Sequence, residues 1–129
     1  MRAERQEAGF TLIELLIVVV IIGILAAIAI PKFAETKGKS YASALKSDLK
    51  NFSSVQEGYF YDNETYATGL GLVSFKPTSG VILTVTEANA NGWSATTTHP
   101  SAAPLTCAVF YGQASPVGPA TAEGTIACQ

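Results

Sequence analysis

The sequence has few of the residues from which catalytic and metal sites are built. The chain of 129 residues has one histidine, His99, and two cysteines, and only 14% of its residues are charged. A zinc site of the usual kind needs several histidine or cysteine ligands, and neither the G-x-S-x-G nor the G-x-x-x-x-G-K-[ST] motif occurs. We therefore expect no enzyme activity, no metal site and no cofactor.

Charge is also unevenly distributed along the chain. The formal net charge is -2 at pH 7. Between Pro31 and Lys50 the sequence has five lysines and two acidic residues, whereas beyond Lys50 it has a single lysine, Lys76, and five acidic residues. A basic stem therefore precedes an acidic head, and this balance predicts no direct contact with nucleic acid.

A long apolar run stands near the amino terminus. Of the 21 residues from Phe10 to Ile30, 18 are hydrophobic, and about 20 residues at a rise of 1.5 Å cross the core of a bilayer. The run predicts a membrane-spanning helix. Such a helix belongs to a removable signal peptide, to a permanent anchor, or to a segment that leaves the membrane for a protein assembly.

A secretory signal peptide fits this run poorly. Ala27 and Ala29 offer an A-x-A cleavage site, but the run exceeds the roughly 7–15 apolar residues of a signal peptide. The preceding residues are not uniformly basic, since they combine Arg2 and Arg5 with Glu4 and Glu7.

Glu14 is the one ionisable residue inside the apolar run. A lone carboxylate at the end of such a helix costs up to a few kcal/mol unless it is partnered or lies at the headgroup boundary. Cleavage between Gly9 and Phe10 would create an α-ammonium four residues before Glu14, on the same chain or on a neighbouring copy. Glu14 is therefore a candidate assembly residue.

The residues around this site resemble the class III signal of type IV prepilins. The resemblance rests on Gly9 followed by Phe10-Thr-Leu-Ile-Glu14, then an unbroken apolar helix with Gly23 and Pro31. It implies that a prepilin peptidase cuts after Gly9 and methylates the amino group of Phe10. It also implies that Glu14 neutralises the amino terminus of a neighbour during assembly. The leader departs from the family pattern, because Glu4 and Glu7 offset its two arginines.

Two signals in the sequence disagree about the side of the membrane on which the head lies. Five lysines follow the apolar run and two arginines precede it, so the positive-inside rule alone would leave the head in the cytoplasm. The pair Cys107 and Cys128 suggests a disulfide and an oxidising compartment. With the prepilin signal, this favours a single-pass inner-membrane precursor with a periplasmic head, and later a pilus on the cell surface.

An amphipathic pattern continues the helix beyond the membrane segment. Apolar residues recur at steps of three and four, which predicts a buried stripe of Tyr41, Leu45, Leu49, Phe52, Val55 and Tyr59. Pro31, Gly23 and Gly38 predict bends or melting in this helix. Gly23 with Ala26, Ala27 and Ala29 forms a small-residue surface on which helices approach closely.

The remainder predicts an α+β fold, with the long helix packed on a four-stranded antiparallel sheet. The expected strands are 81–87, 93–99, 105–111 and 125–128, and a Cys107–Cys128 bridge would tie the last strand to the one before it. The expected organisation is a leader (1–9), a transmembrane and filament-core helix (10–30), its amphipathic continuation (31–58), a helix-to-sheet loop (59–80) and a head with the disulfide region (81–129).

The resemblance implies a major pilin, a self-assembling subunit of a helical homopolymer that serves adhesion, twitching motility or DNA uptake. Its implied partners are the prepilin peptidase, an inner-membrane platform protein, an assembly ATPase and a secretin. The alternatives are a type II secretion pseudopilin, a minor pilin, or a conductive pilus subunit. The cysteine pair and the lack of a calcium-binding loop favour the pilin. We also expect the basic stem to dock on the acidic head of a neighbour, with Lys46 and Lys50 involved.

Overall fold

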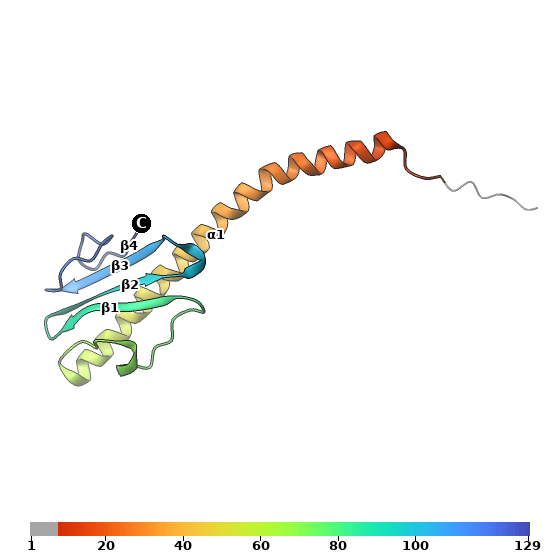
Figure 1. Cartoon of the computed structure of the whole chain (residues 1–129). Helices are drawn as coiled ribbons and strands as arrows, with labels where there is room; N and C mark the ends of the chain where they lie inside the picture. Colours follow the sequence, from red (N-terminus) through yellow and green to blue (C-terminus); the bar gives the residue numbers. More distant parts are fainter. Residues whose placement is uncertain (1–7) are drawn as a thin grey trace, which may run out of the picture. The chain divides into compact units, whose positions relative to one another are not determined.

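The computed structural model describes residues 8–129, so residues 1–7 of the predicted leader lie outside it. The elements are labelled in Figure 1. The helix α1 spans Leu12–Asn63, and it is followed by the strands β1 (Ile82–Asn89), β2 (Gly92–Thr98), β3 (Thr106–Gly112) and β4 (Ala127–Cys128). Short 3-10 helices, η1 (Leu70–Leu72) and η2 (Pro100–Ala102), lie in the connections. The chain divides into two compact units, Met1–Thr36 and Lys37–Gln129.

The described part of the first unit is dominated by helix. From Leu12 to Ile30 the sequence consists of Leu, Ile, Val and Ala apart from Glu14 and Gly23, and Pro31 follows inside α1. The helix nevertheless passes Gly23, Pro31 and Gly38 without interruption, so the predicted melting is absent from the single chain. One proline removes one backbone donor, and the surrounding residues keep their own helical hydrogen bonds.

The second unit confirms the predicted α+β fold. Its four strands form one antiparallel sheet in the order β1-β2-β3-β4, a meander against which the second part of α1 packs. Trp93 on β2 stands opposite Ala88 on β1 and Tyr111 on β3. A β-bulge between Val85 and Glu87 shifts the register of β1.

The core lies between α1 and the sheet. Leu45, Leu49 and Phe52 of the predicted stripe are fully buried, whereas Tyr41, Val55 and Tyr59 are half-buried. The Phe52 ring meets Trp93 edge to face at 5.4 Å, an arrangement that adds to the stabilisation from apolar burial. The helical periodicity therefore identified the centre of the core.

Two polar side chains on the buried face of α1 were missed by the apolar pattern. Asp48 accepts hydrogen bonds from Thr78. Gln56 donates from Nε2 to the carbonyl of Ala67 at 2.9 Å and accepts from its backbone N–H at 2.8 Å. Both therefore fasten the helix-to-sheet loop to the helix.

The helix ends later than predicted, at Asn63 rather than Gly58. Glycine inside a helix costs only about 1 kcal/mol, and the next turn carries Phe60, which stacks on Tyr66 at 4.7 Å. The helix stops where Glu64 adopts a positive φ of 57° and donates its N–H to the carbonyl of Phe60.

The carboxyl-terminal segment is fastened to β3 by a disulfide, by a side-chain hydrogen bond and by backbone hydrogen bonds. Cys107 and Cys128 are register partners on β3 and β4 and are joined by a disulfide. The N–H of Gly112, at the end of β3, donates to Oε1 of Glu123 at 2.7 Å. Backbone hydrogen bonds between Thr106 and Gln129 and from Gly124 to Phe110 extend this attachment beyond the two paired residues of β4.

Candidate assembly segment

Helix α1 begins with a reciprocal set of hydrogen bonds between Thr11 and Glu14. The backbone N–H of Thr11 donates to Oε2 of Glu14 at 2.7 Å, and the Thr11 hydroxyl donates to the same oxygen at 3.0 Å. The N–H of Glu14 in turn donates to the Thr11 hydroxyl at 3.3 Å. This is a capping box, which satisfies donors that the first turn of a helix leaves unpaired.

The capping box gives Glu14 a partner inside its own chain, a role that the sequence reasoning missed. The T-x-x-E spacing before an apolar run carries the signal for it. The carboxylate is thus oriented at the start of α1, four residues after Phe10, whose side chain is 91% exposed. Gly9, Phe10 and Thr11 precede the helix as non-helical chain.

The apolar side chains that follow have no partner within the described chain. The large ones from Leu12 to Ile30 are all at least half exposed. Among the described residues, α1 is the one helix long and apolar enough to cross a membrane. Apolar surface of this extent is stable in a bilayer or against other apolar helices.

The small residues of this segment also lack contacts that would explain them in a single chain. A Cβ added to Gly23 would meet no atom within 4 Å. Ala26 is half-buried, while Ala27 and Ala29 are exposed. Nothing within residues 8–36 therefore requires glycine at position 23, and the position is open to a second helix.

Pro31 lies within α1, near the end of the apolar run. Thr36, one turn further on, donates its hydroxyl hydrogen to the carbonyl of Lys32 at 3.0 Å. The helix therefore continues beyond the proline into the part that packs on the sheet.

The other candidate residues lie elsewhere in the chain. The Cys107–Cys128 disulfide belongs to the second unit, and residues 8–129 contain no group of three or more His, Cys, Asp or Glu side chains placed to hold a metal ion. In that unit the Tyr66 hydroxyl donates to Oε1 of Glu57 at 3.2 Å. Burial, together with the charge and hydrogen bond of Glu57, raises the pKa of Tyr66 above its ordinary value.

A known protein family matches the same segment. The family model of the prokaryotic N-terminal methylation motif aligns with residues 5–30. These residues include the capping box and the whole exposed apolar run.

One relative extends the similarity beyond this segment over most of the chain. The type IV wide pilus major component PilA4 of Thermus thermophilus is 36% identical over 95 residues, covering 69% of this chain and 71% of PilA4. The chain belongs to the type IV pilin family. The type IV major pilin protein PilA of Myxococcus xanthus is 43% identical to this pilin over 79 residues, which cover 61% of the chain and 36% of PilA.

Proteins of the type II secretion system are also similar to this pilin. The core protein G of Dickeya chrysanthemi is 38% identical over 79 residues, which cover 59% of the chain and 52% of that protein. The chain thus spans about a third of the Myxococcus pilin and about half of the secretion protein.

Proposed function

We propose that this chain is a major type IV pilin, the subunit that polymerises into the pilus filament. The observation that carries the proposal is the exposed apolar surface of α1 within the matched methylation motif. In a filament each copy would contribute this surface to a shared core of helices. Repetition of one heterologous contact then builds an open helical polymer.

Processing would create the charge that assembly uses. Prepilin peptidase would cleave after Gly9 and methylate the amino group of Phe10, leaving it cationic. The carboxylate of Glu14, oriented by Thr11 in the single chain, would then exchange this neutral partner for the ammonium of a neighbouring copy. Ion pairing removes much of the cost of a lone charge in an apolar core.

The small residues would let the helices approach one another. Gly23 and Ala27 lie four residues apart and therefore on one side of α1, a spacing found where membrane helices pack closely. At Pro31 the helix lacks one backbone hydrogen bond. We propose this position as the place where α1 yields when the subunit enters the filament.

The disulfide and the methylation motif support a compartment for each part of the chain. The precursor would sit in the inner membrane as a single-pass protein with its disulfide-containing head in the periplasm, and the polymer would then extend from the cell surface. A platform protein, an assembly ATPase and a secretin would serve the assembly. The filament would act in adhesion, twitching motility or DNA uptake as a structural element, without enzyme activity.

The proposal is tested by intact-mass measurement and amino-terminal sequencing of filaments sheared from the cell surface. We expect a chain that starts at N-methylated Phe10 and whose mass lacks two hydrogens relative to the reduced form. A chain that starts after Ala29 would contradict the proposal.

A pseudopilin of type II secretion is the second candidate, favoured by the similarity to core protein G. The same preparation distinguishes the two. A pseudopilin would be processed at Gly9 yet stay in the cell envelope, so that sheared surface filaments would lack it.

A further inference from the structure

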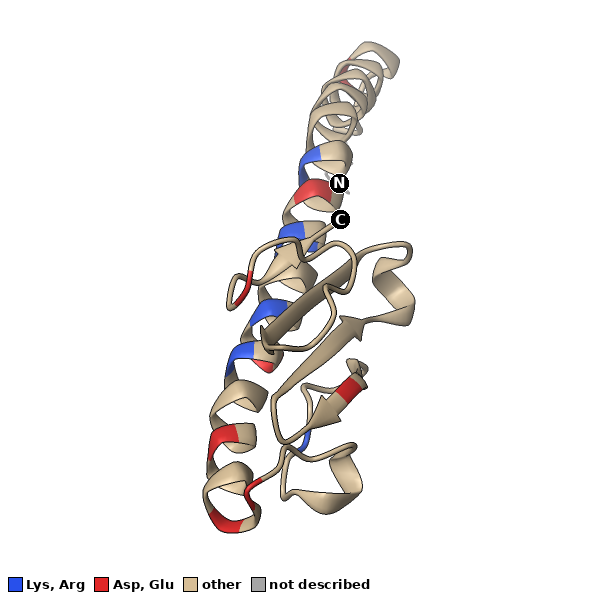
Figure 2. Cartoon of the chain, turned by 90° about the vertical axis from the view of Figure 1, so that its left-hand side faces the viewer, with Lys and Arg blue, Asp and Glu red and all other residues tan. Residues whose placement is uncertain are grey.

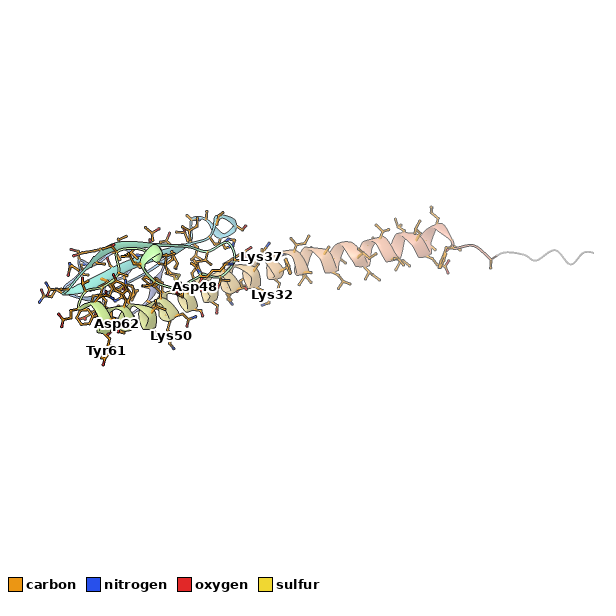
Figure 3. All side chains as sticks on the ribbon, turned by 90° about the horizontal axis from the view of Figure 1, so that it is seen from below. Lys32, Lys37, Asp48, Lys50, Tyr61 and Asp62 are labelled. Atoms are coloured by element: carbon orange, nitrogen blue, oxygen red, sulfur yellow. A yellow bond between two sulfur atoms is a disulfide. The ribbon has the colours of Figure 1, made fainter. Side chains whose placement is uncertain are left out.

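An exposed polar row runs along α1 on the side opposite the core. Its members follow one another at steps of three and four residues, which keeps them on one side of the helix. They are Ser43, Lys46, Lys50, Ser54, Glu57 and Tyr61, all exposed. Figure 3 shows Lys50 and Tyr61 pointing away from the sheet on the same side of α1.

The polar row is charged with opposite signs at its two ends. Lys46 and Lys50 stand near its beginning and Glu57 near its end, and Figure 2 shows acidic residues and no lysine on the last turns of the helix. Within residues 8–129 the structure records no ion pair for Lys46 or Lys50. The cations of the row therefore have no carboxylate partner among the described residues of their own chain.

The acidic end of the row is held in a defined position. Glu57 accepts a hydrogen bond from the hydroxyl of Tyr66 at 3.2 Å. One turn further along, the ring of Tyr61 is 88% exposed. A fixed carboxylate beside an open aromatic face is suited to cations, one through an ion pair and one through a cation–π contact.

We propose that the polar row of one copy lies parallel to the polar row of a second copy, shifted by 11 residues. This shift brings Lys46 against Glu57 and Lys50 against the ring of Tyr61. Eleven residues are about three helical turns, so the shift returns to the same side of the helix and corresponds to about 16 Å along its axis. The inference rests on the proposed function, since it describes a contact between subunits of the filament.

An antiparallel contact would not serve the same purpose. Placing Lys46 opposite Glu57 in antiparallel helices sets Lys50 opposite Ser53 and leaves Tyr61 without a cation. It also makes both copies use the same surface in a closed pair, which ends growth. The parallel, shifted contact satisfies two pairs and repeats from copy to copy.

The direct test is carbodiimide cross-linking of sheared wild-type filaments, followed by mass spectrometry of tryptic peptides. This reagent joins a lysine amine to a carboxylate without a spacer. Within one chain Lys46 and Glu57 are three turns apart on one helix, so an amide between them must connect two copies. We expect the peptide 40–50 linked through Glu57 to the peptide 51–129, because trypsin does not cut the bond between Lys76 and Pro77 and no other lysine or arginine follows. Intact filaments without this link would overturn the inference.

The second test measures filament yield in charge variants. Replacing attraction by repulsion at every subunit contact through Lys46→Glu should lower the yield about tenfold, and the double variant K46E/E57K should restore most of it. The matched control is Lys76→Glu, the same charge change at an exposed site outside the polar row, which should leave the yield unchanged.

The two tests separate the inference from the proposed function. If the wild-type chain forms no filaments, the pilin proposal itself fails. If it forms filaments and K46E matches the wild-type yield, the shifted contact is wrong while the pilin proposal stands. The cross-link decides the contact in the native chain even where E57K disturbs the bond to Tyr66.

Discussion

The buried carboxylate of Asp48 accepts two hydrogen bonds from Thr78, thirty residues later in the chain. Oδ2 receives the backbone N–H and Oδ1 receives the hydroxyl, each at 2.9 Å. Asp48 is only 4% exposed. The pair fixes the end of the helix-to-sheet loop against α1, immediately before β1.

Replacing Asp48 by alanine should destabilise the head by about 2 kcal/mol, because the N–H and hydroxyl of Thr78 lose their acceptor. Urea unfolding of the full chain in detergent micelles measures this, with the fluorescence of Trp93, the one tryptophan and fully buried, as the probe. Ser47→Ala, at the exposed neighbouring position, is the control. Equal unfolding free energies for the two variants would contradict this role for Asp48.

Gln56→Leu should cost about 2 kcal/mol or more, although leucine is of similar size and more apolar. Both backbone groups of the buried residue Ala67 would lose their hydrogen-bond partner. The same urea assay applies, with Asn51→Ala on the exposed side of α1 as control. A loss no larger than that of the control would show that water satisfies these groups.

Alkaline pH should weaken the head through Tyr66. Burial first, and then Glu57, raise its pKa in the folded chain, whereas in the unfolded chain it titrates near its ordinary value of about 10. The unfolded chain therefore loses its proton first as the pH rises, and above about pH 10 the free energy of unfolding falls. The contribution is fully present below that pH.

Comparison of the wild type with Tyr66→Phe isolates this effect. Urea unfolding at about pH 9 and about pH 11 should show a steeper loss of stability for the wild type. Identical slopes in the two chains would assign the alkaline loss to other groups.

Removing the disulfide should destabilise the head by about 3 kcal/mol, because it closes a loop with a sequence separation of 21. The measurement is the thermal midpoint of Trp93 fluorescence with and without reductant. The double variant Cys107→Ala/Cys128→Ala should melt at the midpoint of the reduced wild type and should not respond to reductant. A wild type that melts alike in both conditions would contradict the prediction.

The sequence predicted those parts of the head that depend on periodicity. Leu45, Leu49 and Phe52 recur at helical spacing, so their common burial follows from the chain alone. Asp48 and Gln56 fall on the same face, yet polar residues indicate a surface until their partners are known. Those partners, Thr78 and Ala67, lie in or at the end of a loop without periodicity, where only the folded chain brings them into contact.

The main features of the candidate site could be predicted from the sequence, whereas the end of the helix could not. The apolar run and Glu14 are visible in the sequence because a carboxylate stands out among aliphatic residues. The bonds between Thr11 and Glu14 are local and carry a known spacing, so the same four residues already contained the capping box. The end of the helix was harder to predict, since the stacking of Phe60 on Tyr66 outweighs the low helix propensity of Gly58.

The β-bulge between Val85 and Glu87 affects whether the sheets of different copies can pair at their edges. An open strand edge is a template for β-aggregation, and a bulge spoils that template by breaking its regular ladder. At the opposite edge of the sheet, the N–H of Gly112 at the end of β3 already donates its hydrogen bond to Glu123. Both edges of the sheet are therefore poor templates for pairing with the sheet of another copy.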